Sequence, residues 1–146
     1  MTEAFFIEKK YSGIVFPLNG GRYLLQLRDN NPNITNPGMI SFFGGTVEML
    51  ETFEECIERE VFEEISTDLD WSKTSSICDM VKFERSGVVN LMRIFSSTQF
   101  CASHVNSLHV NEGNLFVLEL DDNSRVPLSP VCRTFFAKYG RRLALN

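Results

Sequence analysis

Residues 44–67 read GGTVEMLETFEECIEREVFEEIST, and no other part of the chain constrains the fold so strongly. Seven acidic residues and one base, Arg59, lie between Glu51 and Glu64, which gives this segment a net charge of −6 where the whole chain carries −5. Carboxylates three or four residues apart on a helix repel each other by a few tenths of a kcal/mol per pair. The segment therefore needs an interaction that offsets this repulsion.

The residues from Thr52 onward have the pattern of an amphipathic helix. Thr52 followed by Glu55 is a capping box, in which each side chain accepts a hydrogen bond from the other residue's backbone N–H. Apolar residues then recur every four positions and form one stripe for burial: Ile57, Val61 and Ile65. We expect a helix from about Phe53 to Ile65.

Three carboxylates of this helix fall on one patch. Glu60, Glu63 and Glu64 are spaced i, i+3 and i+4, so they span about 100° of the helix surface. Converging oxygen anions are the ligands that Mg²⁺ and Mn²⁺ favour, and the spacing predicts a divalent metal site. A solvated acidic helix is the alternative, but it explains neither the Gly44-Gly45 pair nor the base directly before Glu60.

The same stretch resembles the signature of the Nudix hydrolase family. That signature reads Gly, five residues, Glu, seven residues, Arg-Glu, an aliphatic, any residue, Glu-Glu, any residue, Gly, and an aliphatic. The matching residues are Gly45, Glu51, Arg59, Glu60, Val61, Glu63 and Glu64. Ser66 and Thr67 replace the last Gly and the last aliphatic. We expect Ser66 to end the helix at some cost in backbone strain, and every charged position of the signature is retained.

The rest of the chain alternates between strand-like and helix-like patterns. Asn19-Gly20-Gly21 is a hairpin signal between two β-rich runs, and Asp29–Gly38 reads as a loop. A final helix is expected to begin at Ser129-Pro130 and to end at Gly140. The expected strands are Tyr11–Leu18, Arg22–Arg28, Met39–Phe43, Ile77–Phe83, Val88–Ser96 and Leu115–Leu120.

This order of elements resembles the Nudix fold. The expected class is α/β (α+β), an α/β/α sandwich with a mixed β-sheet between helices. The specific resemblance covers residues 44–65 closely and residues 11–120 in general layout. With 146 residues and 43% hydrophobic composition, we expect residues 1–146 to form a single Nudix hydrolase domain.

The resemblance implies hydrolysis of a nucleoside diphosphate linked to another group, with water attacking a phosphorus of the diphosphate. It implies Mg²⁺, or Mn²⁺, as the cofactor. Glu60 and Glu64 are the implied metal ligands, with Glu63 binding a second ion directly or through water, and the backbone carbonyl of Gly44 often joins them in this family. Arg59 is expected to orient carboxylates, by pairing with Glu51, rather than to touch substrate.

Two residues outside the signature are further candidates. Many family members carry a Glu followed by Gly before a late strand, as Glu112 does here, either as a metal ligand or as the general base. An ordinary loop is an equally good interpretation, and the base is left open among Glu112, Glu63 and Glu60. Arg28 occupies a position where relatives often contact phosphate; a strand-end charge paired with Asp29 is the alternative.

The net charge of −5 argues against binding of long DNA or RNA. A small-molecule nucleotide substrate remains open, because a bound divalent metal reverses the local field. No leader or membrane span is evident in the sequence, so we expect a cytoplasmic protein without membrane partners. Relatives often dimerise, which leaves a homodimer open.

The cysteines and histidines show no pattern of a metal or disulfide site. Four cysteines are spread along the chain without a CxxC pair and are expected to be reduced thiols: Cys56, Cys78, Cys101 and Cys132. His104 and His109 lie five residues apart, and we expect structural or surface roles for them.

The sequence leaves the substrate open between modified nucleoside triphosphates and nucleotide sugars. A second function class is a Nudix-fold module that binds a nucleotide as a sensor without cleaving it. Such modules usually lose signature carboxylates, whereas Glu51, Glu60, Glu63 and Glu64 are all present here. Hydrolysis is therefore the leading hypothesis.

Overall fold

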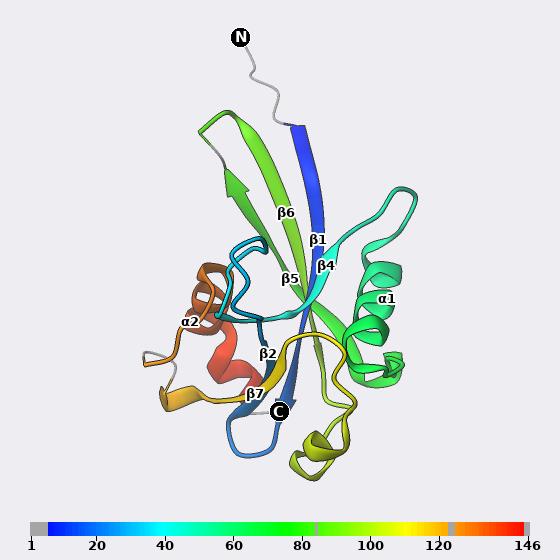
Figure 1. Ribbon diagram of the computed structural model, residues 1–146, viewed down its shortest axis with the longest axis vertical. Helices are drawn as coiled ribbons and strands as arrows, with labels where there is room; N and C mark the ends of the chain where they lie inside the picture. The colour runs from blue at the N-terminus through cyan, green and yellow to red at the C-terminus, as the bar shows by residue number, and fades with distance from the viewer. Residues whose placement is uncertain (1–5, 84, 123–124, 145–146) are drawn as a thin grey trace.

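A mixed β-sheet with one long helix against each face makes up the fold (Figure 1). The computed structural model describes residues 6–83, 85–122 and 125–144. The strands are β1 Phe6–Leu18, β2 Arg22–Leu27, β3 Ile40–Ser41, β4 Phe43–Thr46, β5 Thr74–Phe83, β6 Val88–Ser97 and β7 Asn114–Glu119. The helices are α1 Phe53–Ile65 and α2 Pro130–Ala144, with short 3-10 turns at Trp71–Lys73, Ala102–Ser107 and Leu120–Asp122. The predicted sandwich is confirmed.

The sheet is built around β1. The strand order is β3-β2-β1-β6-β5, with β4 also paired to β1 and β7 to β2. β1 and β6 run parallel and the other pairs are antiparallel. The predicted hairpin is present, with Phe16 opposite Leu24, and its turn has positive φ at Gly20 and Gly21, a conformation that glycine adopts without steric cost.

Besides shifts of one residue and an earlier start of β5, at Thr74 rather than Ile77, two larger differences separate the strands from the sequence-based prediction. β1 begins at Phe6 rather than Tyr11, because its exposed first residues, from Phe6 onward, pair with β6. The predicted strand Met39–Phe43 is divided at Phe42, since Ile40 and Ser41 pair with β2 whereas Phe43–Thr46 pairs with β1. Neighbouring strands decide both boundaries, and local sequence does not contain that information.

Helix α1 has the predicted bounds and caps. The Thr52 hydroxyl accepts from the Glu55 backbone N–H at 3.0 Å, and the Glu55 carboxylate accepts from the Thr52 N–H at 3.1 Å. Ser66 ends the helix in the left-handed conformation, with φ 51° and ψ 39°. The serine therefore takes over the backbone role expected of the signature glycine.

Helix α2 begins at Pro130 as predicted, but Gly140 does not end it. The helix continues to Ala144, and Gly140 lies buried within it. A Cβ at this position would come within 2.8 Å of Leu120 Cδ1, and the Tyr23 hydroxyl donates to the Gly140 carbonyl. Glycine here lets α2 pack closely against the Leu120 side chain of the turn after β7, and it does not form a left-handed cap.

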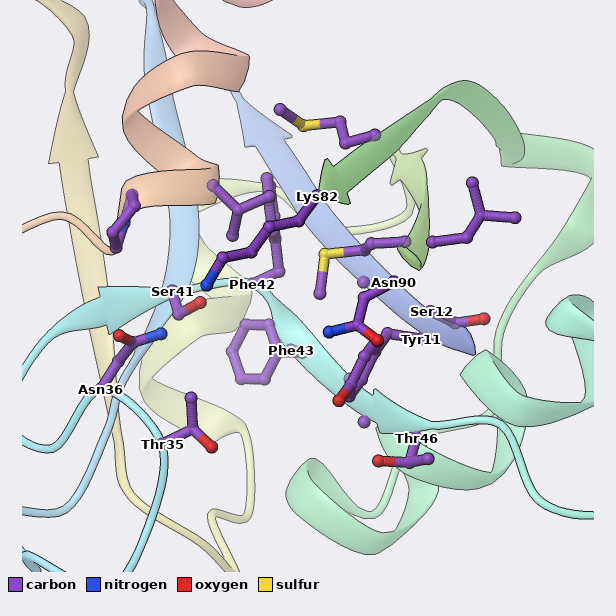
Figure 2. Close-up of a pocket in the computed structure, with 18 of the residues that line it drawn as sticks. Tyr11, Ser12, Thr35, Asn36, Ser41, Phe42, Phe43, Thr46, Lys82 and Asn90 are labelled. Atoms are coloured by element: carbon purple, nitrogen blue, oxygen red, sulfur yellow. The ribbon is translucent and has the colours of Figure 1, made fainter. Parts of the chain in front are cut away.

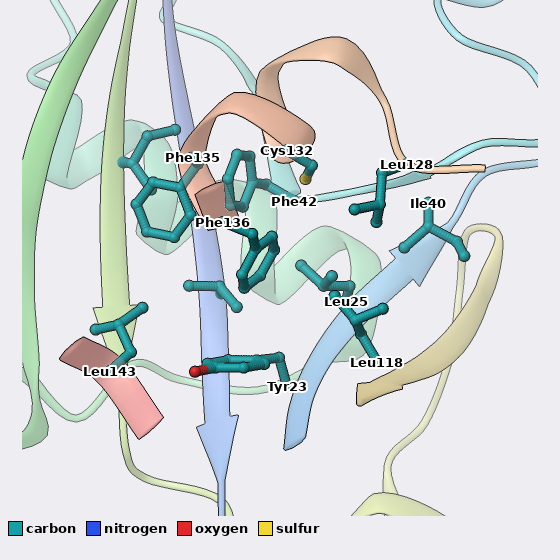
Figure 3. Packing of buried hydrophobic residues seen from close by; sticks show 12 residues of the cluster. Tyr23, Leu25, Ile40, Phe42, Leu118, Leu128, Cys132, Phe135, Phe136 and Leu143 are labelled. Carbon is teal, nitrogen blue, oxygen red and sulfur yellow. The ribbon is translucent and has the colours of Figure 1, made fainter. Parts of the chain in front are cut away.

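Alternating residues of the central strand supply two separate cores. On β1, Ile14 and Phe16 pack toward α1, whereas Val15 packs toward α2. Aromatic rings dominate the core under α2, where Phe42 meets Phe135 edge to face with ring centres 5.3 Å apart (Figure 3). Each helix is thus fixed to its own face of one sheet.

The cysteines and histidines are placed as the sequence suggests. All four cysteines are free thiols; Cys56 and Cys132 are buried. Both histidines are exposed. None of the described helices has the length and apolarity needed to cross a membrane.

The Tyr23 hydroxyl provides a test of how α2 is attached. We expect Tyr23→Phe to lower the free energy of unfolding by about 1 kcal/mol, since it removes one buried hydrogen bond without changing the ring. Urea denaturation monitored by circular dichroism measures this. An unchanged or higher midpoint would show that the bond to Gly140 does not stabilise the helix.

Candidate active site

Glu64 is a buried carboxylate in the last turn of α1, with 2% of its surface exposed. Its Oε1 accepts from the Gly44 backbone N–H at 3.0 Å, and its Oε2 accepts from Gln26 Nε2 at 2.8 Å. Burial raises the pKa of Glu64 to about 9 against the lowering effect of the Gly44 N–H, and the nearby charges of Glu60 and Glu112 raise it further. Such a group is stable when it holds a proton or faces a cation.

Glu60 lies one helical turn before Glu64, and its carboxylate packs against β4. A Cβ built on Gly45 would come within 2.3 Å of Glu60 Oε1, so only glycine leaves room for the carboxylate. Burial raises the pKa of Glu60, although the hydrogen bond from Arg59 opposes the shift. The two carboxylates, Glu60 and Glu64, thus meet beside a backbone segment without side chains.

Arg59 links the helix to the loop before it. Its Nε and one terminal nitrogen donate to the two oxygens of Glu51 at 2.8 and 3.0 Å, which is the predicted pair. The other terminal nitrogen donates to Glu60 Oε1 at 2.9 Å and lies 3.3 Å from Glu63 Oε2. The Arg59 guanidinium lowers the pKa of Glu51 to about 2. The predicted orienting contacts of Arg59 are therefore present.

The other predicted residues lie at the edge of this group. The Glu63 side chain is 49% exposed and turns toward Arg59. Glu112 is exposed in the loop before β7, and its carbonyl accepts from Gln26 Nε2 at 3.2 Å. Gln26 therefore joins the buried Glu64 to the loop that carries Glu112.

Asn111 fixes that loop to the end of α1. Its backbone N–H donates to the Glu64 carbonyl at 2.8 Å, and its side-chain amide donates to the Glu63 carbonyl at 3.0 Å and to Ser66 Oγ at 2.8 Å. These bonds satisfy carbonyls that the helix end leaves without partners. Ser66 stands where the signature has a glycine, and its hydroxyl is one of the groups that hold the Asn111 loop against the end of α1.

Sequence reasoning missed Gln26 and Asn111. A signal for Gln26 exists, because it is the single polar residue in the run of residues 24–27 and shares a strand face with Leu24, so its buried amide requires a polar partner. No comparable signal marks Asn111. Its three bonds depend on where the loop meets the helix, and that is a tertiary contact.

The side chains gathered here are carboxylates, whose oxygens are ligands that divalent cations favour. Among the described residues, no three or more His, Cys, Asp or Glu side chains are arranged to hold a metal ion. Arg59 binds Glu60 and Glu63, while Gly44 and Gln26 bind Glu64. The half-buried Glu60 and the buried Glu64 nevertheless offer hard oxygen ligands where like charges meet.

A cavity of about 710 Å³ lies on the opposite side of β4, toward α2 (Figure 2). Gly44 and Gly45 line it, so the two-glycine segment is shared between the cavity and the carboxylates. Arg28 also lines the cavity, and its Nε donates to the Thr35 carbonyl at 2.6 Å. The structure therefore places Arg28 apart from the carboxylates, on the cavity side.

Comparisons with known proteins agree on one family. The model of the NUDIX domain matches residues 9–99. The structure is similar to the MutT NUDIX hydrolase from Burkholderia pseudomallei (21% identity, 89% of this chain and 96% of that chain, TM-score 0.69) and to the MutT protein from Methanosarcina mazei Go1 (22%, 92% and 94%, 0.70). It is also similar to the E. coli dihydroneopterin triphosphate pyrophosphohydrolase (18%, 94% and 99%, 0.64). At these identities the similarity to the solved structures shows the fold. The comparison with curated proteins found no match.

The contact between Ser66 and Asn111 can be tested by a double-mutant cycle. Ser66→Gly relieves the left-handed strain, worth about 1 kcal/mol, but removes a hydrogen bond of similar value, so we expect little net change. In an Asn111→Ala background the bond is already absent, and Ser66→Gly should stabilise by about 1 kcal/mol. Urea denaturation of the four proteins measures the coupling; equal effects in both backgrounds would refute it.

Proposed function

The chain belongs to the Nudix family, and from this premise we propose that it is a Mg²⁺-dependent hydrolase of nucleoside diphosphate derivatives. Water attacks a phosphorus of the diphosphate linkage that joins the nucleoside to another group. The observation that carries the proposal is the pair of carboxylates, half-buried Glu60 and buried Glu64, beside Gly44-Gly45. We infer that residues 1–146 form one Nudix domain, of which the family model spans 9–99.

In this proposal Glu60 and Glu64 hold the cation, with Glu63 as an added ligand and the Gly44 carbonyl as a further one, and Glu112 is kept for the role of base. When bound, Mg²⁺ or Mn²⁺ supplies positive charge that neutralises the diphosphate oxygens and favours deprotonation of water. Burial of Glu64 supports this role, since a buried carboxylate next to a like charge gains most from a cation.

Arg59 acts as a positioning residue in the proposed mechanism. Its bidentate pair with Glu51 fixes the guanidinium, and its remaining nitrogen then fixes the Glu60 carboxylate against Gly45. A carboxylate held in one orientation binds a cation without first losing rotational freedom.

Glu112 is the general base that the contacts favour. Both Glu60 and Glu63 accept hydrogen bonds from Arg59, so oxygens of both carboxylates are already engaged. The exposed Glu112 lies in a loop that Asn111 and Gln26 fasten to the catalytic helix. We further propose that Arg28, which lines the cavity, contacts a phosphate of the substrate.

The first test is turnover of a substrate panel with Mg²⁺ present. Nucleoside triphosphates, nucleotide sugars, dinucleoside polyphosphates and ADP-ribose are offered, and release of nucleoside monophosphate is measured. We expect at least one substrate to be cleaved, and Glu64→Gln to lower kcat by about 10²-fold or more while the circular dichroism spectrum is unchanged. Absence of turnover across the panel would instead favour a nucleotide-binding sensor.

The second test is stabilisation by the cation. We expect saturating Mg²⁺ to raise the melting temperature, since a ligand at 100 times its dissociation constant stabilises the native state by about 2.7 kcal/mol. Glu60→Gln and Glu64→Gln should each remove most of this shift. Glu54→Gln is the matched control, because Glu54 is exposed on the same helix and should keep the shift. An equal Mg²⁺ effect in all four proteins would contradict the assigned ligands.

A further inference from the structure

Gln26 is a buried amide on the face of β2 that packs toward α1. With 4% of its surface exposed, it shares this face with Leu24. Its Nε2 donates to Glu64 Oε2 at 2.8 Å and to the Glu112 carbonyl at 3.2 Å. A carboxamide nitrogen carries two hydrogens, so these two bonds use both of them. One planar group therefore holds the Glu64 carboxylate and the loop before β7 at the same time.

The chemistry of this contact suits a carboxylate that has to bind a cation. A carboxamide donates a hydrogen bond without carrying charge, so it orients Glu64 and leaves the negative charge for the cation. A Lys or Arg at position 26 would neutralise that charge, and a second carboxylate would repel it. Carboxylates that bind metals are commonly held by hydrogen bonds of this kind, and loss of such a bond weakens metal affinity or activity by about 10–100-fold.

Two routes join the loop of residues 111–113 to α1, whose end lies beside the segment before β7 (Figure 1). In the first route, Asn111 donates to the backbone carbonyls of Glu63 and Glu64, which the helix fixes whatever the carboxylates do. The second route passes through Gln26 and depends on the direction in which the Glu64 carboxylate points. Of the two, the second alone responds to the side chain that we assign to the cation.

Gly113 lets this loop lie against β2 next to Gln26. Its φ is 64°, and a Cβ would come within 2.5 Å of the Leu27 carbonyl oxygen and 3.3 Å of Gln26 Cγ. Glycine is therefore required for the loop backbone to approach the strand this closely. The approach brings the Glu112 carbonyl within reach of the amide, and Glu112 is the residue to which we assign the role of base.

We propose that Gln26 is a positioning residue that couples cation binding at Glu64 to the order of the loop that carries Glu112. A cation held by the Glu64 carboxylate restricts the rotation of that carboxylate. The amide is then fixed as well, and its second bond, to the Glu112 carbonyl, is strengthened. Coupling of this kind is reciprocal, so an ordered loop also raises the affinity for the cation. The inference rests on the proposed function, because it needs the cation site on α1 and the base in the loop.

The test is amide hydrogen exchange of the whole chain, measured by NMR with and without saturating Mg²⁺. In the wild-type protein we expect Mg²⁺ to slow exchange at residues 111–113 by about 10-fold. Gln26→Met keeps the length of the side chain but removes the donor. It should abolish this effect on the loop and raise the dissociation constant for Mg²⁺ by about 10-fold, measured by isothermal titration calorimetry. Tyr23→Phe is the matched control, because it removes a buried hydrogen bond from the same strand on the α2 side; it should keep both properties.

Asn111→Ala separates the coupling from simple attachment of the loop. It removes the side chain that bonds to the end of α1 and leaves the Gln26 route intact. The loop should then exchange faster both with and without Mg²⁺, while the ratio of the two rates persists. A purely structural role of Gln26 predicts the same pattern for Gln26→Met, with faster exchange and an unchanged ratio. That result would overturn the proposal, as would an unchanged Mg²⁺ dissociation constant for Gln26→Met or the absence of any Mg²⁺ effect on the loop of the wild-type protein.

Failure of this inference is distinguishable from failure of the proposed function, because the exchange experiment needs neither substrate nor turnover. A protein that cleaves nothing in the substrate panel but shows protection of the loop that depends on Gln26 would refute only the hydrolase proposal. A protein that Mg²⁺ stabilises against heat, but whose loop exchanges at the same rate with and without Mg²⁺, would refute only the role of Gln26.

Discussion

The burial of the Glu64 carboxylate is the constraint on which the rest of the site depends. A charge removed from water is costly unless it is paired or hydrogen-bonded. Each oxygen of Glu64 accordingly has one donor, the Gly44 N–H and the Gln26 amide. Because the first donor is backbone in β4 and the second is a side chain of β2, placing Glu64 correctly also fixes α1 against two different strands. The chemistry and the packing of the helix are satisfied by the same contacts.

Arg59 stabilises the local fold and the site at once. The acidic helix would repel itself, yet the guanidinium contacts Glu51, Glu60 and Glu63 together. It also donates to the Thr46 carbonyl at 3.1 Å and so joins the helix to the end of β4. Several charges in one partly buried network contribute more than separate surface pairs do. The excess of carboxylates is thereby tolerated without a second base in the segment.

The sequence could predict those features that are set by residues close together in the chain. The bounds and caps of α1, its left-handed end at Ser66, the hairpin at Gly20-Gly21 and the pairing of Arg59 with Glu51 are all local or lie within one motif. The features that could not be predicted depend on partners far along the chain. Gly140 has the appearance of a helix end, but it lies within α2, where its small size allows close contact with Leu120. Asn111 and Gln26 become part of the site through bonds across 38 to 48 positions of sequence.

The two faces of the sheet carry different parts of the proposed site: α1 with its carboxylates lies on one face, and the cavity lies toward α2 on the other. Carboxylates that bind cations must be kept on a rigid element, which the packing of Ile57, Val61 and Ile65 against the sheet provides. Recognition of an organic group needs apolar walls with few polar atoms, which the cavity toward α2 provides. Negative charge near the recognition cavity would repel the phosphates, whereas negative charge is what the metal requires. The cavity and the carboxylates lie on either side of a strand that is only backbone at Gly44 and Gly45, which keeps these opposed electrostatic demands apart.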